Sequence, residues 1–361
     1  MRARNGPMAM IAAALLSALL LGLATLPAAA ETNIAHSATL SLEYDDNVLR
    51  TPSNPDQDFL LRLLYSFDLL YLPRDAHRLE LRYLIGGKKY IDLEREDTLV
   101  NSLFLGYVNS SFNLTDIGVS ANFKLHNLRG SRSSYDKLLL DAFYQRGLPA
   151  DFTIKAAVGF DRFDYIELDY FDYWVHRYNG SFSRNFSRHV QAGLDYVFSQ
   201  KRYAFGAFRR VGQGGGDVIL VQRNTRRVDD RHEPQVWLDL RWRIRAHLGY
   251  ALRIKDSNSY GESYTSHVLS TAFSMPVIDR LSLHWLGIFQ WRDSHEEVTL
   301  PHSGGVEDEE EHLNAVALRA TIHAHKILDI ETRFSRYWSN EPDDNFRFVK
   351  DVVSVGFQFS F

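Results

Sequence analysis

The side chains with the clearest chemical potential in this sequence are charged residues placed at every second position between apolar ones. Over residues 79–83, for example, Glu80 and Arg82 alternate with two leucines and a tyrosine. Successive side chains of a β-strand point to opposite faces, so such a segment carries its charges on one face. Charges enclosed by a protein wall need partners or water. The pattern predicts a polar conduit, or a wall stiffened by cross-strand ion pairs.

The same parity selects further charged residues along the chain, and both signs are well represented. The residues expected to line the conduit are Arg62, Asp68, Glu80, Arg82, Lys124, Asp141, Lys155, Asp195, Asp239, Arg241, Arg253, Glu331 and Arg333. An aromatic edge suited to stacking sugars, or to an interfacial girdle, is formed by Tyr165, Tyr170, Phe171, Tyr173 and Trp174.

Motifs for catalysis or metal binding are weak. The sequence at 295–297 is His-Glu-Glu, without the second histidine of a zinc-protease motif, and His323 and His325 alone are too few ligands for a metal site. No Gly-x-Ser-x-Gly elbow occurs, and Ser257, Ser259 and His267 are not a convincing catalytic set. We therefore expect no enzyme activity, no metal and no cofactor.

The elements that would position the charged residues recur as alternating segments of about ten residues. Residues 59–71 give seven consecutive apolar positions at a spacing of two. Sixteen such segments can be counted, with short connections after even segments and longer polar ones after odd segments. This predicts an all-β chain that forms a transmembrane antiparallel up-and-down β-barrel. Fourteen or eighteen strands stay open, because 203–229 could hold another hairpin, and the soluble alternative is a β-sandwich or propeller.

The first thirty residues have the composition of a secretory signal peptide. Arg2 and Arg4 precede an apolar stretch from Met8 to Ala24, and small residues end it at Ala30. We expect cleavage after Ala30; the alternative is an N-terminal membrane anchor. The predicted domains are a signal peptide over 1–30 and a barrel over 31–361. The chain has no cysteine, so disulfides cannot contribute.

Overall composition resembles that of a soluble protein, as expected when strands hide their apolar face by alternation. The net charge is −4 and the mean hydropathy −0.27. This mild acidity argues against a nucleic-acid partner. Two predicted loops concentrate charge: 200–231 is basic with a glycine-rich centre, and 293–311 is acidic. The first either folds into the channel or stays solvated, and the second is most simply a solvated loop.

The last nine residues alternate Val or Phe with small or polar side chains and finish on Phe357, Phe359 and Phe361. This resembles the terminal strand of Gram-negative outer-membrane β-barrels, whose final Phe signals to the barrel-insertion machinery. The resemblance implies that these three residues act as the insertion signal. It also implies the outer membrane as the location, and outer-membrane lipid and the insertion machinery as partners.

Residues 44–48, Tyr-Asp-Asp-Asn-Val, resemble the opening of β-barrel porin families associated with exopolysaccharide export. The match covers a few residues, and no functional residue is transferred from it. It favours a conduit that exports a secreted polysaccharide and works with periplasmic export proteins. The alternatives are a general diffusion porin and a structural barrel that docks other cell-envelope proteins.

Overall fold

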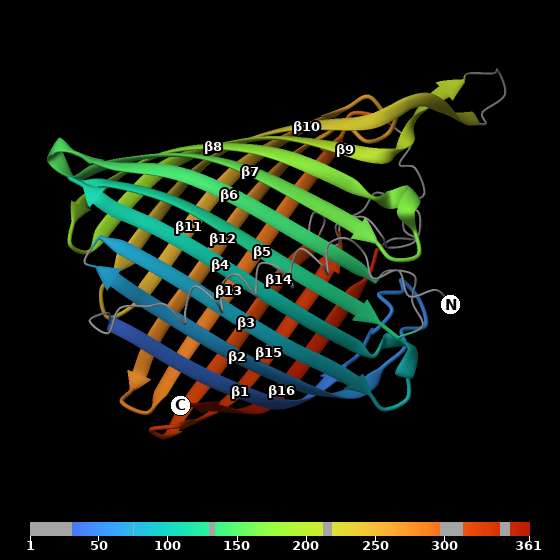
Figure 1. The fold of residues 1–361 in the computed structure, drawn as a ribbon. Helices are drawn as coiled ribbons and strands as arrows, with labels where there is room; N and C mark the ends of the chain where they lie inside the picture. The colour runs from blue at the N-terminus through green and yellow to red at the C-terminus, as the bar shows by residue number, and fades with distance from the viewer. Residues whose placement is uncertain (1–30, 75, 130–133, 212–218, 297–312, 340–346) are drawn as a thin grey trace.

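The computed structural model describes residues 31–74, 76–129, 134–211, 219–296, 313–339 and 347–361. These residues form sixteen β-strands in one closed antiparallel barrel (Figure 1). Each strand pairs with its neighbours in sequence, and β1 pairs with β16 to close the wall. The predicted fold class and the strand number of sixteen are confirmed. The signal-peptide prediction concerns residues outside the described part of the chain.

The odd strands run in one direction and the even strands in the other. The odd strands are β1 (Glu31–Asp45), β3 (His77–Tyr90), β5 (Thr115–Leu128), β7 (Phe152–Tyr165), β9 (Val190–Val211), β11 (Arg245–Ser257), β13 (Leu281–Ser294) and β15 (Leu328–Ser339). The even strands are β2 (Asp58–Arg74), β4 (Thr98–Phe112), β6 (Tyr135–Leu148), β8 (Tyr173–Ser187), β10 (Ile219–Arg241), β12 (Tyr264–Ile278), β14 (Leu313–His325) and β16 (Val349–Ser360).

The connections differ in length between the two ends of the barrel. After even strands they are tight turns, such as 113–114 and 188–189; after odd strands they are longer, such as 46–57 and 166–172. We call these the turn end and the loop end. In bacterial outer-membrane barrels the short turns face the periplasm and the long loops face outward. Three short 3-10 helices, η1 (Glu94–Glu96), η2 (Pro149–Asp151) and η3 (Asp169–Phe171), lie in connections. No helix in the described ranges is long and apolar enough to cross a bilayer.

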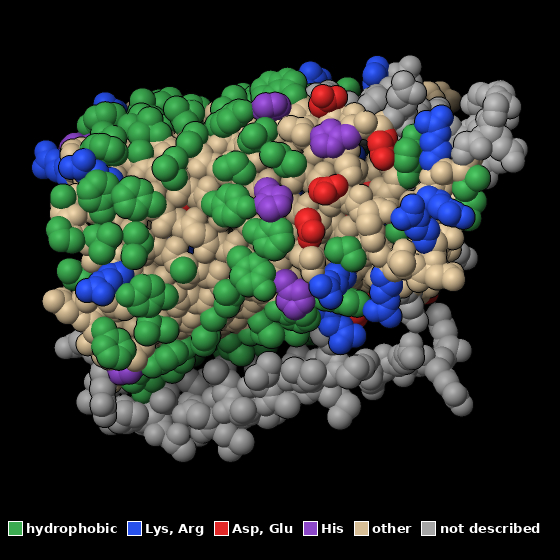
Figure 2. All heavy atoms as spheres, turned by 90° about the horizontal axis from the view of Figure 1, so that it is seen from above, with side chains coloured by type: hydrophobic (Ala, Val, Ile, Leu, Met, Phe, Trp, Pro, Cys, Tyr) green, Lys and Arg blue, Asp and Glu red, His purple; other side chains and the backbone are tan. Residues whose placement is uncertain are grey.

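The outer wall is apolar because one parity of every strand faces outward. In β16, Val353, Val355 and Phe357 are about half exposed, and β1 sets Leu40 and Leu42 beside them in register. A monomeric soluble protein rarely exposes so continuous an apolar surface, whereas lipid would cover it. Figure 2 shows this apolar band on the side of the barrel that is uppermost in Figure 1, with charged side chains gathered toward both ends of the band.

Strands β9 and β10 are the longest, with 22 and 23 residues, and their hairpin projects beyond the barrel at the loop end (Figure 1). The prediction of a loop over 200–231 is therefore wrong for most of that segment. Its basic residues lie on both faces of the two strands, with Lys201 and Arg227 inward and Arg202 and Arg226 outward. Residues 212–218 of the segment lie outside the described residues. A bulge in β10 near Arg226 shifts the register. Opposite it, a Cβ on Gly206 would collide with the carbonyl oxygen of Arg223, so the backbones approach closely there. Of the predicted acidic loop over 293–311, residues 297–311 lie outside the described residues.

Candidate functional site: the barrel lumen

A cavity of about 1090 Å³ lies inside the barrel, lined by residues of β1, β2 and β10 through β16. We call it the polar cavity after its charged residues, although apolar side chains such as Leu64 and Leu286 line it as well. Because β2 and β10 are not neighbours in the sheet, a space that both line is enclosed by the wall. Five of the predicted conduit residues line it: Arg62, Asp239, Arg241, Glu331 and Arg333.

Ion pairs link the charges of this cavity. Glu43 is buried and receives Arg62 Nη2 at 2.7 Å, with Arg333 Nη2 at 4.0 Å on its other oxygen. Asp239 lies 3.6 Å from Arg241 Nη2. The Arg62–Glu43 pair joins the neighbouring strands β2 and β1, as a wall stiffened by ion pairs requires. Arg333 reaches Glu43 across β16, and the Asp239–Arg241 pair lies within β10. Sequence reasoning placed Glu43 on the same face but did not identify it as the carboxylate at the centre of this group.

The remaining predicted conduit residues are spread around the wall rather than gathered at one point. Asp68 lies 3.4 Å from Arg82, whose other nitrogen is 3.6 Å from Glu80. The other contacts are Asp141 with Arg177 at 2.9 Å, Arg253 with Glu233 at 2.8 Å, Lys124 over the Tyr135 ring at 5.6 Å and Lys155 over the Phe143 ring at 4.9 Å. Asp195 pairs in register with Ser181 and Gln235.

Two aromatic rings of the inner wall lie over glycines of the adjacent strand. A Cβ on Gly118 would collide with the ring of Phe143, and one on Gly193 would collide with the ring of Trp237. Both rings are half-buried. Trp237 shares its parity with Asp239 of the polar cavity, two residues further along β10. Glycine therefore makes room for a broad ring surface beside the polar cavity.

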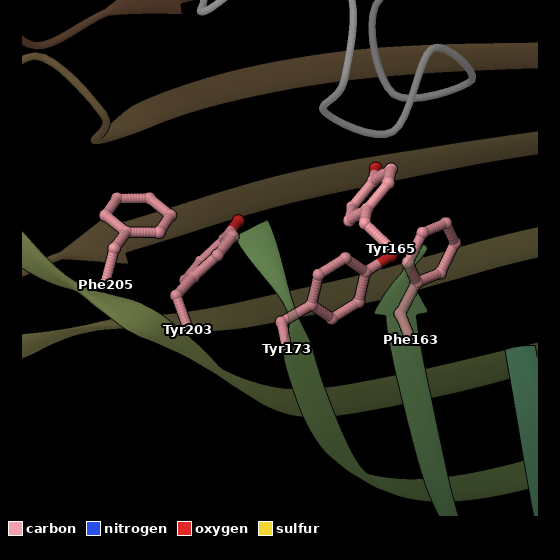
Figure 3. Packing of buried hydrophobic residues seen from close by; sticks show 5 residues of the cluster. All are labelled: Phe163, Tyr165, Tyr173, Tyr203 and Phe205. Carbon is pink, nitrogen blue, oxygen red and sulfur yellow. The ribbon is translucent and has the colours of Figure 1, made fainter. Parts of the chain in front are cut away.

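A larger aromatic cluster occupies the inner wall near the loop end (Figure 3). It comprises Phe163, Tyr165, Tyr173, Tyr203 and Phe205, all buried. Phe163 stacks on Tyr173 with ring centres 4.9 Å apart, and the Nζ of Lys201 lies 3.8 Å from the Tyr173 ring centre. A cation over a ring face is attracted to it.

The cluster changes the predicted aromatic edge in two respects. Tyr165 and Tyr173 belong to it, and Tyr170 and Phe171 pack on it from the loop between β7 and β8. Trp174, however, faces the outer wall, because it follows Tyr173 in the same strand. Sequence reasoning missed Tyr203 and Phe205, whose signal was obscured by the assignment of this region to a loop.

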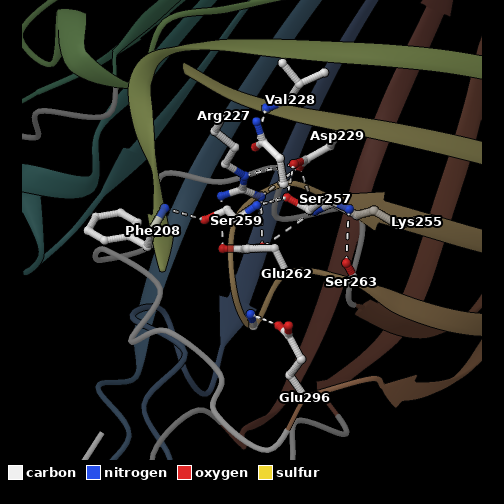
Figure 4. A network of polar contacts seen from close by, with 12 residues as sticks. Phe208, Arg227, Val228, Asp229, Lys255, Ser257, Ser259, Glu262, Ser263 and Glu296 are labelled. Atoms are coloured by element: carbon white, nitrogen blue, oxygen red, sulfur yellow. Dashed lines mark hydrogen bonds and ion pairs between the residues drawn. The ribbon is translucent and has the colours of Figure 1, made fainter. Parts of the chain in front are cut away.

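A buried charged network lies beside this cluster (Figure 4). Arg227 is 2% exposed and donates two hydrogen bonds to each of two carboxylates, Asp229 and Glu262, at 2.8–3.0 Å. Lys255 Nζ lies 3.1 Å from Asp229, and the Arg227 guanidinium lies 4.3 Å from the Tyr203 ring centre. Because Glu262 belongs to the connection between β11 and β12, the network holds that loop against β10.

One carboxylate in a loop has a shifted pKa. Burial alone would raise the pKa of Asp97, but the backbone N–H of Tyr90 donates to it at 2.8 Å and Lys89 lies 3.4 Å away. Arg129 adds a second cation at 3.5 Å. These contacts favour the ionised form, so the pKa of Asp97 lies below its usual range.

The weak catalytic candidates do not form a catalytic group. Ser257 donates to Asp229 at 2.6 Å, and Ser259 accepts a hydrogen bond from the Phe208 backbone N–H at 3.0 Å. His267 lies on the outer wall, 2.7 Å from the Tyr250 hydroxyl. Within the described ranges, no group of three or more metal-ligating side chains is placed to hold a metal ion.

No protein-family model and no curated protein matches this sequence. Among solved structures, the chain is similar to OmpT, an outer membrane protein of Vibrio cholerae, in a form lacking loop L8. The two share 10% identity over 92% of this chain and 100% of the other, with a TM-score of 0.51. A structure titled a bacterial polysaccharide outer membrane secretin covers 90% of this chain and 98% of its own at 10% identity, with a TM-score of 0.46. At 10% identity the similarity to the first structure shows the fold alone, which is that of an outer-membrane β-barrel.

Proposed function

We propose that this barrel is a conduit through which a secreted polysaccharide crosses the outer membrane. The observation that carries the proposal is the half-buried Trp237 ring, which lies on the inner wall over Gly193 and two residues from Asp239 of the polar cavity. A sugar ring has an apolar C–H face that packs on an aromatic ring and hydroxyls that bond to polar groups. The lumen offers both kinds of surface.

The two sides of the lumen have different chemistry. The cavity side, formed by β1, β2 and β10 through β16, presents hydroxyl, carboxylate and guanidinium groups. The side formed by β6 through β9 presents the half-buried ring of Phe143, with Lys155 4.9 Å from its centre, beside the buried aromatic cluster. A barrel of sixteen strands is wide enough for an aqueous channel. A hydrated polymer could therefore slide along the aromatic side while exchanging hydrogen bonds with the polar side.

Assembly and partners form part of the proposal. Cleavage of residues 1–30, recognition of Phe357, Phe359 and Phe361 by the insertion machinery, and delivery of cargo by periplasmic export proteins would place the conduit in the outer membrane. The activity is transport rather than catalysis.

The proposal is tested by recording currents through the purified barrel in planar bilayers. We expect discrete openings, and transient block when neutral oligosaccharides are added. Trp237→Leu should shorten the blocked time by removing the stacking surface, whereas Trp291→Leu, which changes an exposed ring on the outer wall, should not. Absence of openings would refute an open pore.

A general diffusion porin is the second candidate, favoured by the mixed ion pairs of the cavity, such as Arg62 with Glu43. It predicts openings of the same kind with no sugar block and no effect of Trp237→Leu. That result would refute the polysaccharide conduit and support a general diffusion pore.

A further inference from the structure

The outer wall carries three arginines around one tryptophan near the loop end of β7 through β10, which we call the Trp174 cluster: Trp174, Arg162, Arg202 and Arg226. Trp174 pairs in register with Arg162 of β7 on one side and with Arg202 of β9 on the other. The guanidinium of Arg226, from β10, lies 5.6 Å from the centre of the Trp174 ring. Adjacent strands are about 4.8 Å apart, so the cluster spans roughly 15 Å.

The Trp174 cluster lies on the loop-end side of the apolar band. Its arginines are exposed, while Tyr173, the neighbour of Trp174, is buried on the inner face. The next outward positions toward the turn end are Phe160 and His176, whose rings are in contact with centres 5.5 Å apart, and Gln200 and Asp230 on β9 and β10. Figure 2 shows lysine and arginine side chains at the end where the β9–β10 hairpin projects, with acidic side chains and histidines between them and the apolar band. Tryptophan is enriched at this level, where acyl chains give way to headgroups.

Two of the three guanidinium groups are oriented by a hydrogen bond from Nε alone. Arg162 donates through Nε to Asp164 at 3.0 Å, and Arg202 donates through Nε to Gln200 at 2.8 Å. Within the described part of the chain, the terminal amino groups of Arg162 and Arg202 have no hydrogen-bond acceptor. Carboxylates bound the cluster at its edges, with Asp164 on the β7 side and Asp230 held by Gln200 on the β10 side.

We propose that the Trp174 cluster binds a phosphate group of an outer-leaflet glycolipid. Arg202 and Arg226 would hold the phosphate, because the planar guanidinium matches phosphate oxygens with paired N–H groups. Trp174 would lie at headgroup level, and the acyl chains would cover Phe160 and the band below. The occupant is a phosphorylated lipid rather than a soluble anion because the apolar band begins close by, at Phe160 and, one row further, at Val158, Tyr178 and Phe198. This site does not depend on what passes through the lumen.

The test uses the full chain expressed in a Gram-negative host, extracted from the outer membrane in neutral detergent and freed of bound lipid. Calorimetric titration with lipopolysaccharide should show binding that Arg202→Gln with Arg226→Gln weakens about tenfold or more, as loss of charge-assisted bonds implies. Lysine at both positions should give an intermediate affinity, because it keeps the charge but loses the fork. Phosphatase-treated lipopolysaccharide should bind the unaltered protein about as weakly as intact lipid binds the glutamine variant.

Arg336→Gln is the matched control. Arg336 is also an outward arginine near the loop end, but its guanidinium is bound at two points by Asp351, at 2.8 and 2.6 Å. This variant should bind lipopolysaccharide as the unaltered protein does. All comparisons use protein shown to be folded by its heat-modifiable electrophoretic mobility. Equal binding by the glutamine variant, equal binding of phosphatase-treated lipid by the unaltered protein, or full competition by millimolar inorganic phosphate would each overturn the proposal.

Discussion

Replacing Arg227 by alanine should destabilise the barrel far more than replacing an exposed arginine of the wall. The guanidinium makes four hydrogen bonds to Asp229 and Glu262, whose side chains are 3% and 5% exposed. Removing one partner of a buried ion pair costs about 3–5 kcal/mol, because the other charge stays buried and uncompensated. Lys255 remains 3.1 Å from Asp229, so we expect the lower end of that range, about 3 kcal/mol.

The measurement is equilibrium unfolding in urea of the barrel refolded into lipid vesicles, followed by tryptophan fluorescence. Arg336→Ala is the control, because Arg336 is 53% exposed and an exposed pair contributes about 0–1 kcal/mol. Adding Glu262→Gln to the Arg227→Ala chain should recover part of the loss, since it removes one uncompensated buried charge. A cost below about 1 kcal/mol for Arg227→Ala, equal to that of the control, would refute the view that these carboxylates are desolvated.

Three further changes test other parts of the structure. Asp97→Asn should lower the free energy of unfolding at neutral pH. Because the pKa of Asp97 is depressed in the folded protein, the stability that its ionised carboxylate contributes is present above about pH 4 and lost below it. The urea unfolding curves of the two proteins should therefore converge in acid. Gly206→Ala should cost about 1–3 kcal/mol in urea unfolding by forcing a Cβ against a backbone carbonyl of β10, whereas Gly180→Ala, which meets nothing within 4 Å, should be nearly neutral. Phe361→Asp should reduce the amount of barrel recovered from outer membranes, because it places a charge beside the exposed apolar positions of β16; unchanged recovery would contradict an insertion role.

The alternation of apolar and polar residues in recurring segments was sufficient to predict the barrel fold. Residues 59–71 show seven apolar positions at a spacing of two, and the structure makes them part of one strand, β2. The period of two fixes which side chains share a face, and the count of sixteen segments agrees with the alternation of connection lengths. Both are local properties of the chain, so neither needs knowledge of distant contacts.

The error at 200–231 has a physical cause. Arginines there occupy strand positions where apolar residues would be expected, because the β9–β10 hairpin extends beyond the apolar band and has no lipid to face. Arg227 and Lys201 nevertheless keep the inward parity and contact buried rings. Composition therefore indicated a loop where hydrogen-bonded pairing maintains strands. The bulge near Arg226 adds a register shift that no periodicity could reveal.

Contacts between side chains of different strands could not be predicted from the sequence. Gly193 and Trp237 lie far apart in sequence and meet because β9 and β10 pair in one register. The sequence indicated that both belong to strands, but not that a glycine on one strand makes room for a ring on the next. The contacts of Arg227 with its carboxylates could not be predicted either, since Glu262 reaches Arg227 from the loop that follows β11.

Strand register couples the inner and outer sites. Tyr173 belongs to the lumen cluster and Trp174, the next residue, to the outer arginine cluster, so a one-residue slip of β8 would exchange the two faces. Single side-chain changes on one face should leave the other intact: Trp237→Leu should alter sugar block without altering lipid binding. A change that disturbs pairing, such as Gly206→Ala beside the β10 bulge, should impair both. Loss of both properties in a single side-chain variant would therefore indicate a register defect rather than a shared site.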